Sequence, residues 1–483
     1  MEKKEKKTWN PNPYVLLLII ILICSVATWI VPAGSFERVY DEELGRNLVV
    51  PGSFEYIEDT PVGITGFLES VFNGFCDAAD IIFFILFAAA YVNVLSSKGA
   101  LNALTGYLLR TLGDKDVLII PAFMLLFGLG GTTFGMFEET YALIPAFIVI
   151  AIALGYDRIV GGAIVFVGVA TGFAAATLNP FTIGVASAVA EVDLVTPKLL
   201  AFRIVCFVLF EVLAVAYVMR YANKIRKDPT KSVMYGDANA LEGTENLGSK
   251  EEIMNAHFSN QHKLALLGFI ALIVILILGI ILQGWYLGEI ATLFLVFMVL
   301  TCLIYRLKSN EIADMFVAGA KSALFGAMLV GMARGVSIVM TDGNIIDTCV
   351  NALANVVSQL PESVNAIGMV VVQNLVNFFI PSGSGQAVVT MPILAPVADL
   401  IGQSREVAVI AFQFGDGFSN MFWPTAVATE CGIMGVGLNR WYKFITPLFG
   451  MMFLLQWESK LYEFQQYMPK EKGRRIGLCT PSL

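Results

Sequence analysis

The sequence predicts an all-α polytopic membrane protein made of two inverted repeats, with about nine full spans and two re-entrant helical hairpins. Its composition is 57% hydrophobic and 14% charged, whereas soluble domains carry about 25% charged residues. Two glycine- and hydroxyl-rich interruptions, residues 130–135 and 381–386, each follow a short apolar stretch, residues 118–129 and 369–380. A dozen helical residues reach about 18 Å, which is short of the roughly 30 Å hydrocarbon core.

The two interruptions also predict the class of function. Lipid cannot satisfy free backbone amides, so broken backbone at that depth must line a polar cavity or be buried in protein. A matched pair of broken segments in two halves of a chain is typical of the binding site of a secondary transporter. We therefore expect an inverted-repeat secondary transporter.

The elements of the first half follow from hydropathy and charge. The lysine-rich start is expected in the cytoplasm and the acidic residues 35–62 outside, by the positive-inside rule. Residues 1–61 then form an N-terminal span and outer loop, and residues 62–220 form repeat 1. The expected elements are spans at 14–31, 81–97, 159–190 and 199–219, an amphipathic helix at 101–111, and hairpin 1 at 118–154. The third of these spans is interrupted at Asn179-Pro180.

The second half begins after a polar cytoplasmic loop, residues 221–262. Residues 263–309 form a connecting two-span hairpin, residues 310–460 form repeat 2, and residues 461–483 form a polar tail. The expected elements are spans at 264–282, 287–304, 318–340 and 442–457, an amphipathic helix at 345–357, hairpin 2 at 369–401, and a span interrupted around 416–424.

The two repeats match at separated positions. Gly131 corresponds to Ser382, Pro145 to Pro392, and Pro180 to Pro424, at similar offsets of 244–251 residues. An odd number of spans separates the two hairpins, so we expect them to enter from opposite faces. The same count places the C-terminus outside. This conflicts with the positive-inside rule, because the C-terminal segment carries the basic residues Lys470, Lys472, Arg474 and Arg475.

Several other classes of function are disfavoured. The only histidines, His257 and His262, lie in the predicted cytoplasmic loop. The chain has no nucleophile elbow, Walker loop or zinc-protease motif. It has no basic patch with interleaved aromatic residues of the kind that binds nucleic acid. We therefore expect no enzyme, no cofactor and no nucleic-acid partner, but a small-molecule substrate and a lipid bilayer.

The hairpin tips carry the first candidate residues. Helix ends expose free amides that attract carboxylates, and hydroxyls suit Na⁺ or a polar substrate. The alternative is that these small residues only allow close helix packing. The predicted substrate-binding tip residues are Thr132, Thr133, Ser382, Gly383 and Ser384.

The two breaks carry the second group. Proline removes an amide donor and frees a carbonyl, so Asn179, Thr182, Ser419 and Asn420 are expected to contact substrate or ion. The alternative is a proline kink without any ligand role.

Charged residues in apolar segments form the third group. A charge at bilayer depth usually faces a cavity or a partner. Glu138, Glu139 and Asp416 are expected to bind a cationic group or to carry a proton, although Glu138 and Glu139 also suit an interfacial hairpin end. For Arg334 we favour an internal ion pair over a clamp for a substrate anion.

Four long motifs resemble a known family of carriers. They are GGTTFGMFEE (130–139), NPFTIG (179–184), IPSGSGQAVVTMPILAP (380–396) and FQFGDGFSNMFWPT (412–425). Together they resemble the YfcC-type carriers, which belong with the DcuC-like C4-dicarboxylate carriers of the ion transporter superfamily. The resemblance covers about residues 10 to 460.

The resemblance implies an often dimeric secondary transporter of organic anions or amino acids, some members resembling arginine/ornithine exchangers. Relatives carry Ser-Asn-Thr at the tips, where Na⁺ and a substrate carboxylate bind. This chain has Gly131-Thr132-Thr133 and Ser382-Gly383-Ser384 instead. Na⁺ near Thr132, Asn179, Ser384 and Asn420, or H⁺, are the candidate coupling ions.

The balance of charge sets the expected substrate. Hairpin tips favour a carboxylate, whereas the acids near the breaks favour a cation. A basic amino acid satisfies both, so we expect an arginine/ornithine-type antiporter in the cell inner or plasma membrane, with its N-terminus in the cytoplasm. The alternative is a Na⁺- or H⁺-coupled carrier of C4-dicarboxylates or other organic anions, which needs cotransported cations because Arg334 alone supplies fixed positive charge.

Overall fold

The fold was analysed in a computed structural model, which describes residues 12–42, 46–112, 117–193, 196–237, 240, 257–285 and 287–458. The lysines at the start of the chain, most of the central part of the predicted 221–262 loop, and the predicted tail 461–483 lie outside these residues.

Helices make up nearly all of the described secondary structure. The longer helices are α1 (Pro13–Ala27), α2 (Ile64–Asp77), α3 (Ala79–Ser97), α4 (Ala100–Leu112), α5 (Ile119–Phe134), α6 (Ile144–Ala153), α7 (Arg158–Ala174), α9 (Pro197–Lys227), α11 (Asn260–Gln283), α12 (Leu287–Ile304), α13 (Ser309–Asp342), α14 (Ile346–Ser358), α15 (Glu362–Phe379), α16 (Gly383–Leu400), α17 (Arg405–Ser419), α18 (Pro424–Met434) and α19 (Leu438–Glu458). Short turns of helix are η2 (Glu138–Ala142), η3 (Pro180–Gly184), α8 (Val185–Val189) and η4 (Pro229–Lys231).

The mostly helical structure agrees with the expected fold class, and the predicted outer loop contains short strands that the sequence did not predict. Four short strands, β1 (Gly34–Ser35), β2 (Arg38–Asp41), β3 (Arg46–Val49) and β4 (Glu55–Tyr56), form two antiparallel pairs, β1 with β4 and β2 with β3. These strands are held to α14 from outside the loop: Asp347 accepts hydrogen bonds from the Phe36 amide at 3.0 Å and the Arg38 guanidinium at 2.8 Å. Such long-range partners leave no local signal in the sequence.

Helix α2 is a second element that hydropathy did not predict. It is amphipathic, and Asp77 is its last residue. Asp80 lies in the first turn of the next helix, α3. Helix α2 packs against α13, and this contact brings Asp77 close to Arg334 of α13.

Five described helices are long and apolar enough to cross a membrane: α3, α9, α11 over Asn260–Ile280, α12 and α13. Helices α1, α5, α6, α7 and the η3–α8 pair are apolar but shorter. The expected count of about nine full spans therefore remains a prediction. Helix α9 also continues to Lys227, beyond the expected end of its span at 219 and into the predicted cytoplasmic loop.

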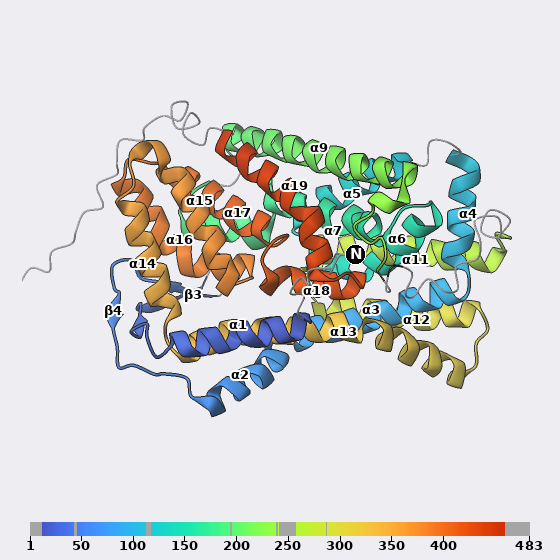
Figure 1. The fold of residues 1–483 in the computed structure, drawn as a ribbon, viewed down its shortest axis with the longest axis horizontal. Coiled ribbons are helices and arrows are strands. Elements are labelled where there is room, and N and C mark those ends of the chain that lie inside the picture. The colour runs from blue at the N-terminus through green and yellow to red at the C-terminus, as the bar shows by residue number, and fades with distance from the viewer. Residues whose placement is uncertain are drawn as a thin grey trace, which may run out of the picture.

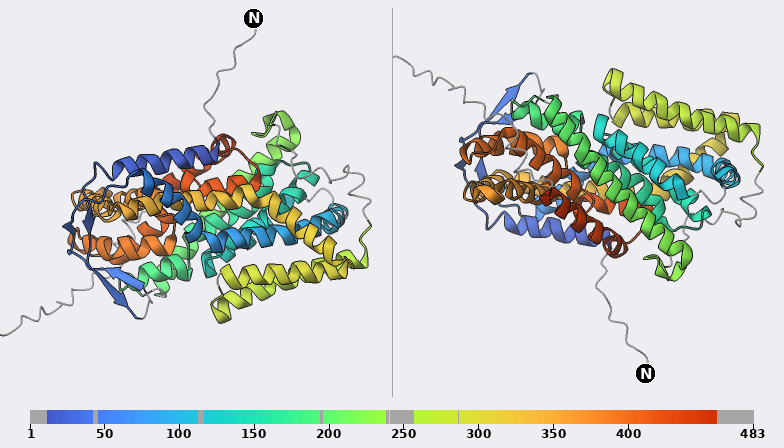
Figure 2. Two further views of the ribbon diagram at one scale, coloured as in Figure 1. Left: turned by 90° about the horizontal axis from the view of Figure 1, so that it is seen from below. Right: turned by 90° about the horizontal axis from the view of Figure 1, so that it is seen from above.

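The long helices run along the longest axis of the molecule, with α9 and α13 on opposite sides (Figure 1). Hairpin 1 is the pair α5 and α6 with η2 between them, and hairpin 2 is the pair α15 and α16. The two hairpins lie toward opposite ends, hairpin 2 near α14 and the strands and hairpin 1 near α4 (Figure 1). Helix α1 lies along α13 (Figure 2). The entry of the two hairpins from opposite faces of the membrane remains a prediction.

Both predicted breaks are present. In the first half, α7 ends at Ala174 and the π-helical turn η3 begins with Pro180 after the N-cap Asn179. In the second half, α17 ends at Ser419 and α18 begins with Pro424. Proline suits the first position of a helix because its missing amide would be unpaired there anyway. Each break therefore ends one helix and starts the next.

Glycines hold α5 against α7. A side chain on Gly131 would overlap the carbonyl oxygen of Val169, and one on Gly172 would overlap that of Gly128. The two backbones are thus in direct contact, as in membrane helix pairs that use small residues. This contact fixes the tip of hairpin 1 beside the first break.

Candidate functional site

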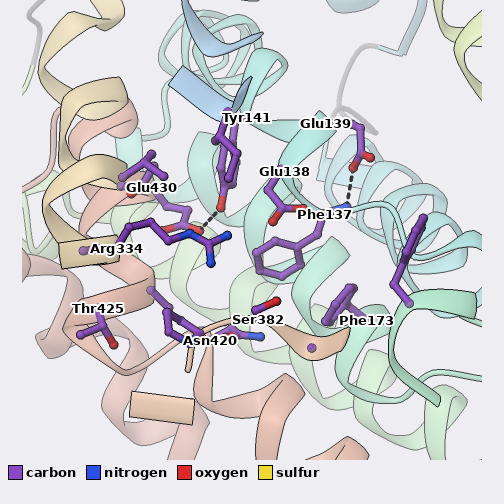
Figure 3. Close-up of a pocket in the computed structure, with 18 of the residues that line it drawn as sticks. Phe137, Glu138, Glu139, Tyr141, Phe173, Arg334, Ser382, Asn420, Thr425 and Glu430 are labelled. Atoms are coloured by element: carbon purple, nitrogen blue, oxygen red, sulfur yellow. Dashed lines mark hydrogen bonds between the residues drawn. The ribbon is translucent and has the colours of Figure 1, made fainter. Parts of the chain in front are cut away.

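One pocket lies where both hairpin tips and both breaks meet. It holds about 980 Å³ of space between atoms, including its open mouth. Its walls come from the tip of hairpin 1, the tip of hairpin 2, the turn η3, the second break with α18, and α13. Figure 3 shows these side chains pointing into a common space.

The tip of hairpin 1 brings acidic side chains to the pocket. Gly135 ends α5 with φ +75°, a left-handed conformation that favours glycine. The chain then passes through Phe137 to the short helix η2, where both Glu138 and Glu139 line the pocket. The Glu139 carboxylate accepts a hydrogen bond from the Phe137 amide at 2.9 Å and is buried. Glu139 therefore braces the tip, whereas the Glu138 side chain lies in the pocket on the side of Arg334 (Figure 3).

The tip of hairpin 2 brings a helix N-terminus. Ser382 caps α16, and its Oγ accepts a hydrogen bond from the Gly385 amide at 3.3 Å. Ser382, Gly383 and Ser384 all line the pocket. The first turn of α16, a helix of 18 residues, therefore presents its amide end to the pocket, which favours an anionic group there.

Two further charged residues, Glu430 and Arg334, line the pocket. Glu430 on α18 is buried, and its Oε1 accepts a hydrogen bond from the Tyr141 hydroxyl at 2.7 Å. Its Oε2 has no hydrogen-bond partner among the described residues. Arg334 on α13 interacts electrostatically with Glu138 and places its Nε 3.6 Å from Asp77 Oδ2. The pocket thus offers acidic groups and one guanidinium within the same space.

The expected ion pair of Arg334 is confirmed, but its partner comes from a distant part of the chain. That partner is Asp77 at the end of α2, not Asp342, the nearest charged neighbour in the sequence. About half of the Asp77 side chain is exposed, and a pair screened by water in this way contributes little to stability.

Half of the predicted site residues line the pocket. These are Glu138, Glu139, Ser382, Gly383, Ser384 and Asn420. The other six lie around the pocket without lining it: Thr132, Thr133, Asn179, Thr182, Asp416 and Ser419.

Hydrogen bonds explain the position of most of the second group. The Thr132 hydroxyl donates to the Ala175 carbonyl at 2.8 Å and thereby ties the hairpin 1 tip to the first break. The Thr133 hydroxyl donates back to Leu129 of its own helix. Asn179 accepts from the amides of Phe181 and Thr182 and so caps η3. Ser419 donates to the Asp416 carbonyl at 2.9 Å.

The four residues expected near Na⁺ fall in two places. Ser384 and Asn420 line the pocket, whereas Thr132 and Asn179 lie in the bonded contact between hairpin 1 and the first break. The Thr132 and Asn179 oxygens already accept amide donors, from Thr177 and Phe181. One ion that touches all four residues does not fit this arrangement, so Na⁺ coupling remains a prediction.

Among the pocket residues that sequence reasoning left out of the site, three bear on its charge: Tyr141, Arg334 and Glu430. Glu430 and Arg334 carried a usable signal, because each is a charged residue inside an apolar segment. Tyr141 carried none, since its partner Glu430 is 289 residues away.

Comparisons with known proteins agree with the resemblance of the motifs. A family model described as DcuC, the C4-dicarboxylate anaerobic carrier, matches residues 11–458. A protein of Escherichia coli (strain K12) named "Putative basic amino acid antiporter YfcC" is 31% identical over 495 residues, covering 94% of this chain and 96% of that one. An uncharacterized protein of Haemophilus influenzae is 28% identical over 494 residues, again covering 94% and 96%.

Solved structures of transporters are also similar, at a lower level. The YdaH transporter of Alcanivorax borkumensis has 17% identity and a TM-score of 0.42, with coverage of 93% of this chain and 98% of that one. MtrF of Neisseria gonorrhoeae, described as one of a class of antimetabolite efflux pumps, has 20% identity and a TM-score of 0.42, with 95% coverage of both. On the match to the family model and to its relatives, the chain belongs to the DcuC family of membrane carriers.

Proposed function

We propose that this carrier is a secondary active antiporter that exchanges basic amino acids across the cell membrane. The observation that supports this most is the mixed charge of the single pocket shared by both hairpin tips. Glu138 and Glu430 face the same space as Arg334 and the amide end of α16. An arginine or ornithine molecule carries groups that complement both.

Each end of such a substrate has a counterpart. The α-carboxylate would meet Arg334 or the amides of Gly383 and Ser384, where a helix N-terminus attracts anions. The cationic side chain would meet the free oxygen of Glu430 and the carboxylate of Glu138. In a pocket of low dielectric these charged contacts are strong, and a missing partner is costly. This requirement favours a substrate with both kinds of charge.

The family description points to a second candidate, a C4-dicarboxylate. Such a substrate would place two carboxylates among Glu138, Glu139 and Glu430, with Arg334 as the one basic side chain lining the pocket among the described residues. It would need cotransported Na⁺ or H⁺ to balance its charge. The name of the Escherichia coli relative, a basic amino acid antiporter, agrees better with the acids of the pocket.

Alternating access around the two hairpins is the mechanism we propose. The breaks and the glycine-rich tips supply short segments that reorient without unfolding a long helix. We further propose a multi-pass protein of the inner or plasma membrane, with a cytoplasmic N-terminus and a homodimeric assembly.

Counterflow in proteoliposomes tests the substrate. Vesicles loaded with ornithine should take up labelled arginine without added energy, whereas vesicles with no internal amino acid should not. Asp399→Asn is a suitable control variant, because Asp399 pairs with Arg405 outside the pocket. Uptake of labelled succinate into succinate-loaded vesicles, with no arginine uptake, would contradict the amino-acid proposal.

A further inference from the structure

Asp416 is a buried carboxylate directly behind the tip of hairpin 2. It lies in the last turns of α17, is fully buried, and does not line the pocket. Neither of its side-chain oxygens has a hydrogen-bond partner among the described residues. An uncompensated carboxylate in this position departs from the usual pattern, in which buried charges are paired.

The tip itself covers this carboxylate. A Cβ placed on Gly383 would lie 3.3 Å from Asp416 Oδ2 and 3.6 Å from the Phe173 ring, and it would overlap the Thr182 methyl group. Asp416, Thr182 and Phe173 therefore all lie against Gly383. The groups that lie against Gly383 are this carboxylate, a methyl group and an aromatic ring, and the Asp416 oxygens accept no described hydrogen bond from the tip.

The charged and titratable groups on the neighbouring elements lie elsewhere. Arg158 of α7 donates to the Met434 carbonyl, Asp399 of α16 pairs with Arg405 of α17, and Arg440 of α19 pairs with Asp237. On the side of α9, Arg203 and Cys206 line a small second cavity with Gln413, and Glu211 lies against Gly128. Glu406 lies at the start of α17, and Tyr442 and Lys443 lie on α19. No described ion pair reaches Asp416.

The uncharged polar neighbours do not supply the missing donors. Asn377 on α15 directs its amide nitrogen to the Asp416 backbone carbonyl, to Ser419 Oγ and to Asn420 Oδ1. The Gln413 amide donates to the Phe173 carbonyl at 2.7 Å. The hydroxyl of Thr182 has no described hydrogen-bond partner. A hydroxyl can donate one bond, which is too little to stabilise an ionised carboxylate that is fully buried.

We propose that Asp416 binds a proton and that this site, closed by Gly383, couples proton movement to the opening of hairpin 2. A proton removes the charge of the carboxylate and needs no extra space. A metal ion would need several oxygen ligands around it, and the described residues hold no group of three acidic, histidine or cysteine side chains placed to bind one. The proton site follows from burial and contacts alone; its coupling to amino-acid movement rests on the function proposed above.

The coupling follows from the position of the tip. While hairpin 2 is closed, the O–H bond of the Asp416 carboxyl is shielded from water. When the tip moves away, the carboxyl ionises and its proton passes to water on the side to which the pocket is open. Return of the tip requires a proton to be taken up again, because closure over a bare carboxylate would bury a lone charge.

Thermal unfolding of the purified protein in detergent tests the proton site without any transport. A carboxyl that stays protonated in the folded state gives stability that is lost as the pH rises, because the unfolded chain has already released that proton. Tm of the unmodified protein should therefore fall more steeply than Tm of Asp416→Asn as the pH rises above about 4, where an unfolded aspartate loses its proton. Asp416→Glu keeps a carboxyl group and should keep the steep slope, and Asp399→Asn should match the unmodified protein.

The pH dependence of the exchange rate tests whether the Asp416 proton is coupled to transport or whether the carboxyl is only buried. Exchange should slow as the pH rises in the unmodified protein, and the lower rate of Asp416→Asn should be independent of pH. The matched control is Glu211→Gln, since Glu211 is equally buried with both oxygens unpartnered among described residues but lies away from the tip. That variant should flatten the Tm profile and leave the pH profile of exchange in place.

Three results would overturn the proposal. The first is an equal pH slope of Tm with and without the Asp416 carboxyl. The second is a rise of Tm with NaCl over choline chloride that Asp416→Asn abolishes, which would assign the site to Na⁺. The third is an exchange rate whose pH profile survives in Asp416→Asn. If the unmodified protein exchanges no amino acid at all, the transport proposal fails, and the Tm slopes still decide whether Asp416 holds a proton.

Discussion

The two hairpin tips share one sequence pattern but differ in how their polar groups are paired. At the tip of hairpin 1, Thr132 is bonded to the first break through the Ala175 carbonyl and the Thr177 amide. At the tip of hairpin 2, Ser382 to Ser384 line the pocket, and both oxygens of Asp416 behind them lack a described partner. The first tip is therefore locked to its break, whereas the second closes over a group whose charge depends on conditions.

This difference assigns unequal roles to the two halves. Satisfied polar networks make a structure rigid, and incompletely satisfied ones mark sites of function. We therefore expect hairpin 1 to supply a fixed wall with Glu138 and hairpin 2 to supply the element that moves. The predictions below test that division by changing matched residues in the two halves.

The largest expected effect is a rise of KM when either of two pocket acids, Glu430 or Glu138, is replaced. Glu430→Gln removes a buried charge that would face the cationic end of the substrate, so KM for arginine should rise by about thirty-fold or more. Glu138→Gln removes an acid that is less buried, and KM should rise by about three- to ten-fold. Counterflow rates over a range of arginine concentrations measure both, with circular dichroism as a check on folding. Equal KM values in the unmodified protein and the two variants would show that neither acid binds the substrate.

The next effect concerns Gly383, where hairpin 2 meets the first break. Gly383→Ala places a methyl group onto the Thr182 methyl, so hairpin 2 should close incompletely and exchange should fall by about ten-fold. Thr182→Ser removes that methyl and keeps the hydroxyl. Combined with Gly383→Ala, it should restore most of the exchange rate. A double variant as slow as the single one would show that the tip does not need to approach Thr182.

The sequence was a good guide to the parts of this architecture that depend on local pattern. Periodic apolar runs predicted α3 and α12 within a few residues, and proline marked both breaks. Glycine and hydroxyl residues marked the tip of hairpin 2, which does line the pocket. These features arise from backbone chemistry that each segment carries by itself.

The remaining features depend on contacts between distant segments. The strands β1 to β4 are held to Asp347 by residues that lie more than 300 positions away in the chain. Thr132 was predicted to bind substrate, and nothing in the sequence indicates that its hydroxyl is used by Ala175. Asp416 was placed in the substrate site because it is charged and lies in a break, but only the packing of Gly383 shows that it lies behind the pocket wall.

A smaller effect is expected on the free energy of unfolding, which should differ between variants at the two corresponding tip positions, Gly131 and Ser382. Gly131→Ala would push a methyl group into the Val169 carbonyl, and a backbone atom cannot move aside easily, so the free energy of unfolding should fall by about 3 kcal/mol. Ser382→Ala removes only a helix cap and should lower it by about 1 kcal/mol. Chemical or thermal unfolding in detergent compares them. If Ser382→Ala were the more destabilising change, hairpin 2 would be the rigid half.

The smallest effects lie within hairpin 1, at the adjacent residues Thr132 and Thr133. Thr132→Val leaves the Ala175 carbonyl and the Thr177 amide without their partner, and it should lower the free energy of unfolding by about 2 kcal/mol. Thr133→Val loses only a bond within its own helix, and the change should stay within about 0.5 kcal/mol. Neither variant should raise KM for arginine, because neither side chain lines the pocket. A raised KM in Thr133→Val with unchanged stability would mean that this hydroxyl reaches the substrate in another conformation, and hairpin 1 would then be a moving element like hairpin 2.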